Sequence, residues 1–202
     1  MLASVILAAG ESRRMGSPKA TLPYPTTEAT PGKVTFLDHL LSISRHPKIG
    51  YHRVVLGANA EKIRKRVNLK DDWIVFNPDW KQGQLSSIHA AIRSLPAGAT
   101  DGIIVFLVDH PLITEAVVSL LIENFYASRA PVVIPTLNGK RGHPVIFAAP
   151  TYDELLAAPL DTGARQVVWA HQADLLEVPT TEEGVILNLN DPDAMRHIAG
   201  GA

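Results

Sequence analysis

The sequence predicts an α/β fold in three layers, with a mostly parallel sheet between two layers of helices. Short apolar runs alternate with amphipathic segments along the chain, which is the pattern typical of parallel α/β sheets. The run 102–108, Gly-Ile-Ile-Val-Phe-Leu-Val, is the most apolar of these and indicates a buried central strand. The chain of 202 residues can bury a substantial core, and we expect a single domain over residues 1–202.

The predicted elements alternate between strands and helices. Helix 35–46 begins with Thr35-Phe36-Leu37-Asp38, a capping-box start. Helix 84–95 has one apolar face that should pack on the sheet. The members of that face are Leu85, Ile88, Ile92 and Leu95. The proline- and threonine-rich segment from Leu22 to Thr35 predicts a surface loop over the site. In order, we expect strand 3–8, helix 35–46, strand 52–56, helix 59–68, strand 73–76, helix 84–95, strand 102–108, helix 114–128, strand 131–134, helix 150–157, helix 163–171 and strand 174–178.

Composition and charge exclude several classes of protein. Hydrophobic residues make up 46% and charged residues 19%, which is ordinary globular composition. The net charge of −1 gives no sign of a nucleic-acid partner. Cysteine is absent, so disulfides and thiolate metal sites are excluded. No basic region precedes the apolar start, and no apolar run reaches the length of a membrane span. We expect a cytoplasmic protein without a membrane partner.

The segment 7–19 carries the strongest functional signal. It reads Leu-Ala-Ala-Gly-Glu-Ser-Arg-Arg-Met-Gly-Ser-Pro-Lys and follows a short apolar run. Small residues at the end of a strand let a ligand approach the backbone, and the basic side chains can bind phosphate oxygens. The segment is not a Walker loop, because Ser-Pro separates Gly16 from Lys19, and it lacks the second glycine of the dinucleotide fingerprint. We expect a site for a nucleoside triphosphate; a tight strand–helix turn is the alternative.

The same segment resembles the signature of the nucleotidyltransferases that load a nucleotide onto molybdopterin. That signature is L-A-A-G-x-S-x-R-M-G followed shortly by lysine, and segment 7–19 matches it throughout. The resemblance implies a Rossmann-like sheet of the nucleotide-diphospho-sugar transferase type. Arg13 and Lys19 are the expected catalytic residues of this segment, which would neutralise charge on the phosphates. The implied nucleotide-binding residues of this segment are Leu7, Ala8, Ala9, Gly10, Arg13 and Lys19.

Asp109 provides a second candidate element, directly after the run 102–108. Ligands of open α/β sheets bind beyond the carboxyl ends of the strands, so Asp109 should lie at the same edge as segment 7–19. Mg²⁺ takes oxygen ligands, typically one or two carboxylates plus substrate phosphates, and Asp109 is therefore a candidate catalytic Mg²⁺ ligand. The alternatives are a cap of the helix near Thr114 or a turn with Pro111. We interpret His110 as a packed or solvated loop residue rather than a catalytic one.

Segment 80–88 extends the resemblance. It is similar to the family's glycine-then-serine segment, which lies near the base and ribose, and so implies that Ser86 and Ser87 bind the nucleotide. Both serines are expected at a helix N-terminus, where free N–H groups and hydroxyls can bind polar ligand atoms. A plain helix cap is the alternative.

Two further segments resemble the acceptor side of the same family. Arg141-Gly142-His143-Pro144 matches its R-G-H-P segment, which implies acceptor binding by Arg141 and His143. Residues 161–165 are similar to its G-D-x-G-A-R segment and add Asp161 and Arg165, although Leu160 replaces the leading glycine. A helix cap with a surface arginine explains the last segment almost as well.

The closing segment 188–194 departs from the family. The motif there is usually D-I-D-T-P-E-D, whereas this chain has Asn-Leu-Asn-Asp-Pro-Asp-Ala. The asparagines resemble the guanylyltransferase branch, while Leu7 to Gly10 resemble the cytidylyltransferase branch. Asn190 can ligate Mg²⁺ through its amide oxygen, and Asp191 can compensate for the missing charge. A helix N-terminus at 190–192 is the alternative.

The expected reaction is Mg²⁺-dependent nucleotidyl transfer. A phosphate oxygen of the acceptor attacks the α-phosphorus of the triphosphate and pyrophosphate leaves, which requires mainly positioning and charge stabilisation. We expect CTP to be preferred over GTP because the methyl group of Ala9 occupies space that a purine would need. The expected partners are a molybdopterin-like phosphorylated acceptor and a molybdoenzyme. Two alternatives stay open: a sugar- or alditol-phosphate nucleotidyltransferase, and a non-catalytic accessory protein of molybdoenzyme maturation.

Overall fold

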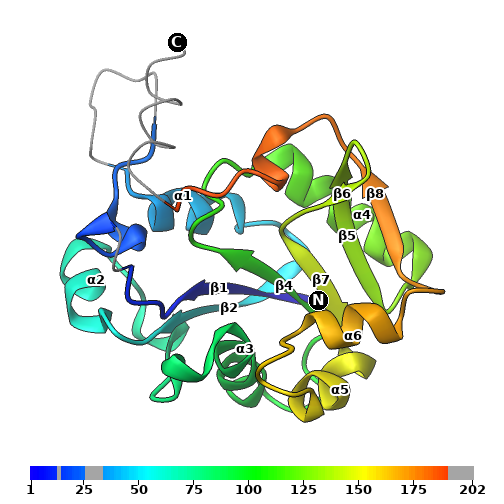
Figure 1. The fold of residues 1–202 in the computed structure, drawn as a ribbon, viewed down its shortest axis with the longest axis horizontal. Coiled ribbons are helices and arrows are strands. Elements are labelled where there is room, and N and C mark those ends of the chain that lie inside the picture. The colour runs from blue at the N-terminus through cyan, green and yellow to red at the C-terminus, as the bar shows by residue number, and fades with distance from the viewer. Residues whose placement is uncertain (13–14, 26–33, 191–202) are drawn as a thin grey trace.

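The fold consists of strands and helices in the part of the chain that the computed structural model describes, residues 1–12, 15–25 and 34–190 (Figure 1). The strands are β1 (Leu2–Ala8), β2 (Ile49–Leu56), β3 (Ile74–Phe76), β4 (Gly102–Leu107), β5 (Val132–Leu137), β6 (Lys140–Arg141), β7 (Val145–Ala148) and β8 (Leu176–Pro179). The helices are α1 (Phe36–Ile43), α2 (Ala60–Arg66), α3 (Gln84–Arg93), α4 (Glu115–Ser128), α5 (Tyr152–Ala157) and α6 (Arg165–Ala170). Within these ranges, no helix is long and apolar enough to cross a membrane.

The strands form one sheet in the order β3-β2-β1-β4-β7-β5-β6, and β8 pairs with β5. Strands β3, β2, β1 and β4 are parallel neighbours, while β7 runs antiparallel between β4 and β5. The register pairs Leu7 with Leu107, so β1 and β4 end level with each other. The segments that follow these two strands therefore emerge at the same edge of the sheet.

Helices cover both faces of the sheet, and two buried apolar clusters lie between the layers (Figure 1). Helices α1, α2 and α4 contribute to one cluster, and α3, α5 and α6 contribute to the other. Along β1, Leu2 and Ile6 belong to the first cluster and Val5 and Leu7 to the second, as the alternation of a strand requires. These layers confirm the predicted three-layer α/β fold with a mostly parallel sheet.

Local signals for two helices are confirmed. At the start of α1, the Thr35 hydroxyl accepts a hydrogen bond from the Asp38 N–H, and the Asp38 carboxylate accepts one from the Thr35 N–H at 2.9 Å. This reciprocal capping box satisfies donors that the helix itself cannot pair. On α3, Leu85, Ile88 and Ile92 are buried in the second cluster. The predicted loop from Leu22 to Thr35 includes residues 26–33, which lie outside the described residues.

The sequence does not predict β6 and β7, and this is the main correction to the expected order. Strand β7 has only four residues and directly follows the segment interpreted as an acceptor motif. Its place between β4 and β5 depends on pairings with residues 102–105 and 132–133, which are distant in sequence. Local pattern cannot reveal such pairings. Other boundaries shift by a few residues: β2 begins at Ile49 rather than 52, and β5 continues to Leu137.

Candidate functional site

A cavity of about 430 Å³ lies at the carboxyl edge of the sheet, where β1 and β4 end. We call it the nucleotide cavity. Its lining comes from the end of β1, the turn before Lys19, the start of α3 and the end of β4. The lining includes Leu7, Ala8, Ala9, Gly10, Ser12, Lys19, Trp80, Gly83, Gln84, Ser87, Leu107 and Asp109. The structure thus brings the described residues of segment 7–19 and Asp109 to one site, because parallel strands end at one edge.

Lys19 connects three separate parts of the chain. Its Nζ donates to Asp109 Oδ2 at 3.3 Å and to Asn190 Oδ1. The backbone N–H of Leu189 donates to the Asp109 carbonyl at 2.7 Å, which holds the closing segment against the end of β4. The side chains of Lys19 and Asp109 are only 14% and 26% exposed, so their attraction is less screened than that of a surface pair. Two oxygen acceptors from distant segments therefore converge on the Lys19 ammonium.

Gly57 and Trp80 form a tightly packed wall beside this cavity. A Cβ on Gly57 would lie 2.6 Å from the Ala9 carbonyl oxygen and 2.8 Å from Trp80 Cβ. The N–H of Ala58 donates to the same Ala9 oxygen at 3.1 Å. The absence of a side chain at position 57 thus allows the indole and the backbone of segment 7–10 to approach closely.

The two serines of α3 have different surroundings. Ser87 lines the nucleotide cavity, whereas Ser86 is not among the residues that line it. The Ser86 hydroxyl donates to the carbonyls of Asp79 and Gly83, at 3.0 and 2.7 Å. Asn77 Nδ2 donates to the Oγ atoms of both serines. Ser86 therefore holds the loop before α3, and a role in binding nucleotide stays a prediction for both residues.

A second cavity of about 490 Å³ adjoins the first, and we call it the acceptor cavity. It brings together all four residues predicted for the acceptor side, and Gly83 and Gln84 line both cavities. Its walls are formed by α3, the strands β4, β5 and β7, and α6 with the turn before it. The lining includes Leu85, Ile88, Val105, Ile134, Arg141, His143, Val145, Phe147, Leu160, Asp161, Gly163, Arg165, Val168 and Trp169.

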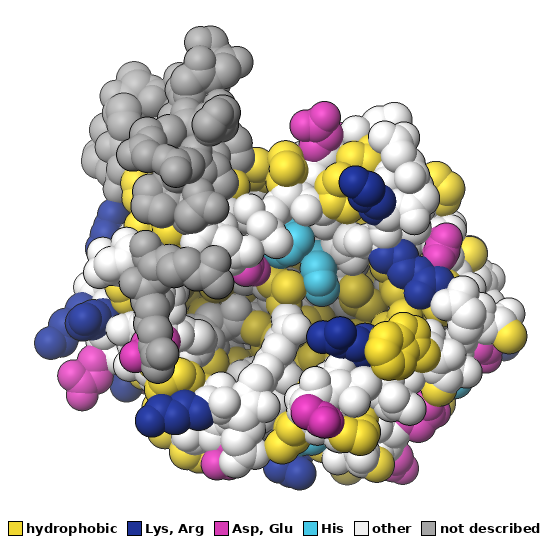
Figure 2. All heavy atoms as spheres, in the orientation of Figure 1, with side chains coloured by type: hydrophobic (Ala, Val, Ile, Leu, Met, Phe, Trp, Pro, Cys, Tyr) yellow, Lys and Arg dark blue, Asp and Glu magenta, His cyan; other side chains and the backbone are white. Residues whose placement is uncertain are grey.

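Arg141 is held by neighbouring side chains at the margin of the acceptor cavity. Its Nε donates to Glu177 Oε1 at 2.7 Å and its Nη2 to Gln172 Oε1 at 2.8 Å. Asp161 and Arg165 are exposed and flank the turn around Gly163, whose φ of +75° favours glycine. Figure 2 shows Lys and Arg side chains along the margin of the hollow on this face. Binding of an acceptor by these residues stays a prediction.

His143 lines the acceptor cavity, and Figure 2 shows histidine side chains in the hollow on this face. The rings of His110 and His143 have centroids 4.9 Å apart, and the Nδ1 atom of each is buried without a hydrogen-bond partner in the described structure. Burial, with repulsion from His110, lowers the pKa of His143 to about 4, although Asp109 opposes the change. Burial also lowers the pKa of His110. Both rings are therefore neutral near pH 7. His110 is buried, as expected for a packed residue, and the absence of a catalytic role stays a prediction.

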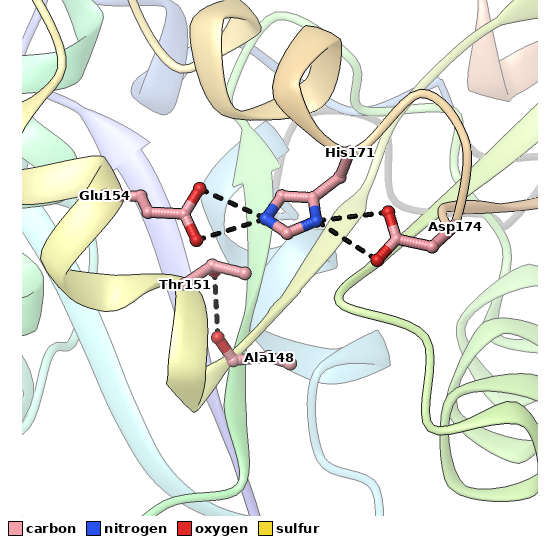
Figure 3. Close-up of polar contacts among 5 residues, drawn as sticks. All are labelled: Ala148, Thr151, Glu154, His171 and Asp174. Atoms are coloured by element: carbon pink, nitrogen blue, oxygen red, sulfur yellow. Dashed lines mark hydrogen bonds and ion pairs between the residues drawn. The ribbon is translucent and has the colours of Figure 1, made fainter.

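A polar cluster fixes the end of α6 next to the acceptor cavity (Figure 3). His171 Nδ1 lies 3.1 Å from Asp174 Oδ1, and His171 Nε2 lies 3.1 Å from each carboxylate oxygen of Glu154 on α5. Partial burial opposes protonation of His171, but hydrogen bonds and attraction from both carboxylates outweigh it and raise the pKa. We refer to these three residues as the His171 cluster.

Two predicted residues are not placed by the structure, and three residues of the nucleotide cavity were not predicted from the sequence. Arg13 and Asp191 lie outside the described residues. Trp80, Gln84 and Gly57 are not among the predicted site residues, although they line or shape the nucleotide cavity. A glycine directly after β2 is a signal that could have indicated the close approach at Gly57.

The fold and the site define an α/β protein with two adjoining cavities, one of them at the carboxyl ends of β1 and β4. Residues 4–175 match the family model described as the MobA-like NTP transferase domain, so the chain belongs to this family of nucleotidyltransferases. The resemblance drawn from segment 7–19 is thereby confirmed. Membership implies a nucleoside triphosphate as substrate and a phosphorylated acceptor.

Curated relatives are similar over most of the chain. The chain is 28% identical over 192 residues to the molybdenum cofactor cytidylyltransferase of Escherichia coli K12, covering 94% of this chain and 91% of that protein. It is 27% identical over 205 residues to a probable molybdenum cofactor guanylyltransferase of Mycolicibacterium paratuberculosis, covering 98% and 95%. A nicotine blue oxidoreductase of Paenarthrobacter nicotinovorans is 34% identical over 153 residues, covering 72% and 70%.

Solved structures share the fold. Rv0371c from Mycobacterium tuberculosis H37Rv superimposes with a TM-score of 0.79 at 24% identity, covering 100% of both chains. A structure of Rv0371c in complex with manganese gives a TM-score of 0.76, also at 24% identity, covering 100% of this chain and 99% of that one. Molybdopterin-guanine dinucleotide biosynthesis protein A from Archaeoglobus fulgidus gives a TM-score of 0.69 at 18% identity, covering 98% and 97%.

Proposed function

We propose that this protein transfers CMP from CTP to a molybdopterin cofactor and releases pyrophosphate, and that a molybdoenzyme receives the product. The observation that carries the proposal is that the nucleotide cavity and the acceptor cavity share Gly83 and Gln84. A triphosphate in the first cavity and an acceptor in the second would meet at this junction. The names of the cytidylyltransferase and guanylyltransferase relatives support molybdopterin as the acceptor.

In this mechanism, the acceptor phosphate attacks the α-phosphorus and the protein mainly positions and neutralises charge. Lys19 and Arg13, which lies six positions before it in the sequence, would neutralise charge that develops on the α-phosphate and the leaving pyrophosphate. The small residues Ala8, Ala9 and Gly10 let the triphosphate approach the backbone. A general base is not needed, because a phosphate is already ionised near neutral pH. Arg141 and Arg165 would bind the anionic end of the acceptor.

The residues around Lys19 fit a divalent cation. Asp109 offers a carboxylate and Asn190 an amide oxygen, and both already bind the Lys19 ammonium. Mg²⁺ prefers oxygen ligands and typically combines one or two protein oxygens with substrate phosphates. We therefore propose Asp109 and Asn190 as its protein ligands. The bound ion would supply positive charge to the phosphate oxygens. Manganese belongs in the test because one structure of this fold is a manganese complex.

The preference for CTP rests on Ala9. Its side chain is 5% exposed and lines the nucleotide cavity beside Trp80. A methyl group at this position reduces the space for a larger purine base. Discrimination by one methyl group is modest, about 1–3 kcal/mol, so the preference should be roughly tens-fold and not absolute.

A pyrophosphate-release screen tests the proposal. Purified protein is incubated with CTP, GTP, ATP or UTP, with Mg²⁺ or Mn²⁺, and with molybdopterin or common sugar phosphates. Release that requires molybdopterin and is fastest with CTP is the expected result. Release with a sugar phosphate would identify the sugar-nucleotide alternative, and tight binding without release would identify an accessory protein. Oxidoreductase turnover without pyrophosphate release would place the chain with the relative named as a nicotine blue oxidoreductase.

A further inference from the structure

An exposed tryptophan stands at the mouth of the acceptor cavity. Trp169 on α6 lines this cavity with Val168 and Arg165, and it is 56% exposed. Tryptophan is highly buried on average, because its large ring gains free energy on leaving water. Trp169 instead offers a flat apolar face to an occupant of the cavity.

The other walls of the acceptor cavity match this aromatic face. The inner wall is apolar and includes Ile134, Val145 and Phe147, all buried. Arg141 and Arg165 add positive charge near the mouth. Apolar walls, an aromatic face and guanidinium groups together suit a flat ring system that carries an anionic group. A saturated sugar ring can pack on the indole only through its C–H groups, whereas a flat ring system offers a whole π face.

The His171 cluster holds the helix end that carries Trp169. His171 follows Trp169 by two residues and contacts both Glu154 on α5 and Asp174 in the following turn (Figure 3). The backbone N–H of His171 donates to the Val167 carbonyl at 3.1 Å, which joins the cluster to the last turn of α6. Movement of His171 would therefore move the indole relative to the cavity.

We propose that Trp169 is the ring-stacking residue of the acceptor cavity and that His171 positions it through Glu154 and Asp174. This inference rests on the proposed function and deepens it by naming the acceptor class, a flat ring bearing a phosphate. Trp169 determines specificity for such acceptors over sugar phosphates. His171 is a positioning residue, since it acts through the indole.

The test compares the KM for molybdopterin with the KM for the preferred triphosphate. Trp169→Ala should raise the KM for molybdopterin about 10-fold, the range expected for loss of ring stacking. It should change kcat and the KM for the triphosphate less than about twofold. Trp169→Leu removes the ring while keeping an apolar side chain, and it should resemble Trp169→Ala. Trp169→Phe should recover most of the loss. Phe76→Ala is the matched control, because Phe76 is 60% exposed on β3 and lines neither cavity; it should change neither KM.

The positioning role of His171 is tested by a double-mutant cycle. His171→Ala should also raise the KM for molybdopterin, and Trp169→Ala/His171→Ala should be no worse than Trp169→Ala alone. Additive effects would overturn the positioning role. An unchanged KM for molybdopterin in both Trp169→Ala and Trp169→Leu, or an equal rise for the triphosphate, would overturn the stacking role.

Failure of the proposed function gives a different result. If the wild type releases no pyrophosphate with any triphosphate and molybdopterin, nucleotidyl transfer to molybdopterin is refuted. Calorimetric titration of the wild type and Trp169→Ala with molybdopterin then decides the inference separately. Weaker binding by the variant supports it. Equal binding, or no binding by the wild type, overturns it.

Discussion

Gly57→Ala should damage the nucleotide cavity without removing any functional group. The new Cβ would lie 2.6 Å from the Ala9 carbonyl oxygen and 2.8 Å from Trp80 Cβ. The van der Waals optimum of two nonbonded heavy atoms is a separation of about 3.5 Å. The Ala9 carbonyl oxygen and Trp80 Cβ must therefore move away by roughly 0.7–0.9 Å. One neighbour is backbone of the segment that we expect to hold the triphosphate. A misplacement of about 1 Å can cost 10²-fold in rate, and we expect kcat/KM for CTP to fall about 10- to 100-fold.

Steady-state pyrophosphate release, measured well below the melting temperature, checks this prediction. Overpacking should also cost about 1–3 kcal/mol of stability, so the Tm should fall by about 2–12 °C. Gly50→Ala is the matched control, because its Cβ would meet the Met1 Sδ at 3.2 Å, a flexible side chain at the other end of β2. Wild-type kcat/KM in Gly57→Ala would refute the reasoning, since it would mean that the wall can shift freely.

Three further predictions follow from the site. Lys19→Ala should lower kcat about 10²- to 10³-fold, as expected for loss of one preorganised charge contact, while an unchanged kcat in steady-state assays would assign Lys19 a structural role. Ala9→Gly should narrow the preference for CTP over GTP; calorimetric titration with each triphosphate tests this, and an unchanged ratio of affinities would count against it. The raised pKa of His171 means that its protonated form stabilises the fold fully below about pH 6.5, and that this stability is lost as pH rises through the raised value. The Tm deficit of His171→Gln relative to wild type should therefore be larger near pH 6 than near pH 9, and equal deficits would contradict the pairing with Glu154 and Asp174.

Local patterns in the sequence predicted much of the framework. The apolar run 102–108 and its position in an alternating α/β pattern indicated β4, and the end-of-strand position of Asp109 placed it beside segment 7–19. The capping box at Thr35 and the apolar face of α3 were also readable, because both depend on residues within one or two helical turns. Strand β7 could not be predicted from local patterns, because it pairs with β4 and β5, which are separate segments of the chain.

The sequence by itself determined the alternation of most strands and helices, the family signature and the expectation that segment 7–19 and Asp109 lie at one edge of the sheet. These features follow from short-range periodicity and from the geometry of parallel strands. Only the tertiary structure decided that the Asn190 side chain binds Lys19 and that the rings of His110 and His143 lie next to each other. It also decided that Trp80 packs so closely on Gly57 that a side chain there has no room. It also placed Trp169 and the His171 cluster beside the acceptor cavity. Such contacts join residues that are distant along the chain, and their formation depends on packing of the whole sheet and its helices rather than on any local preference.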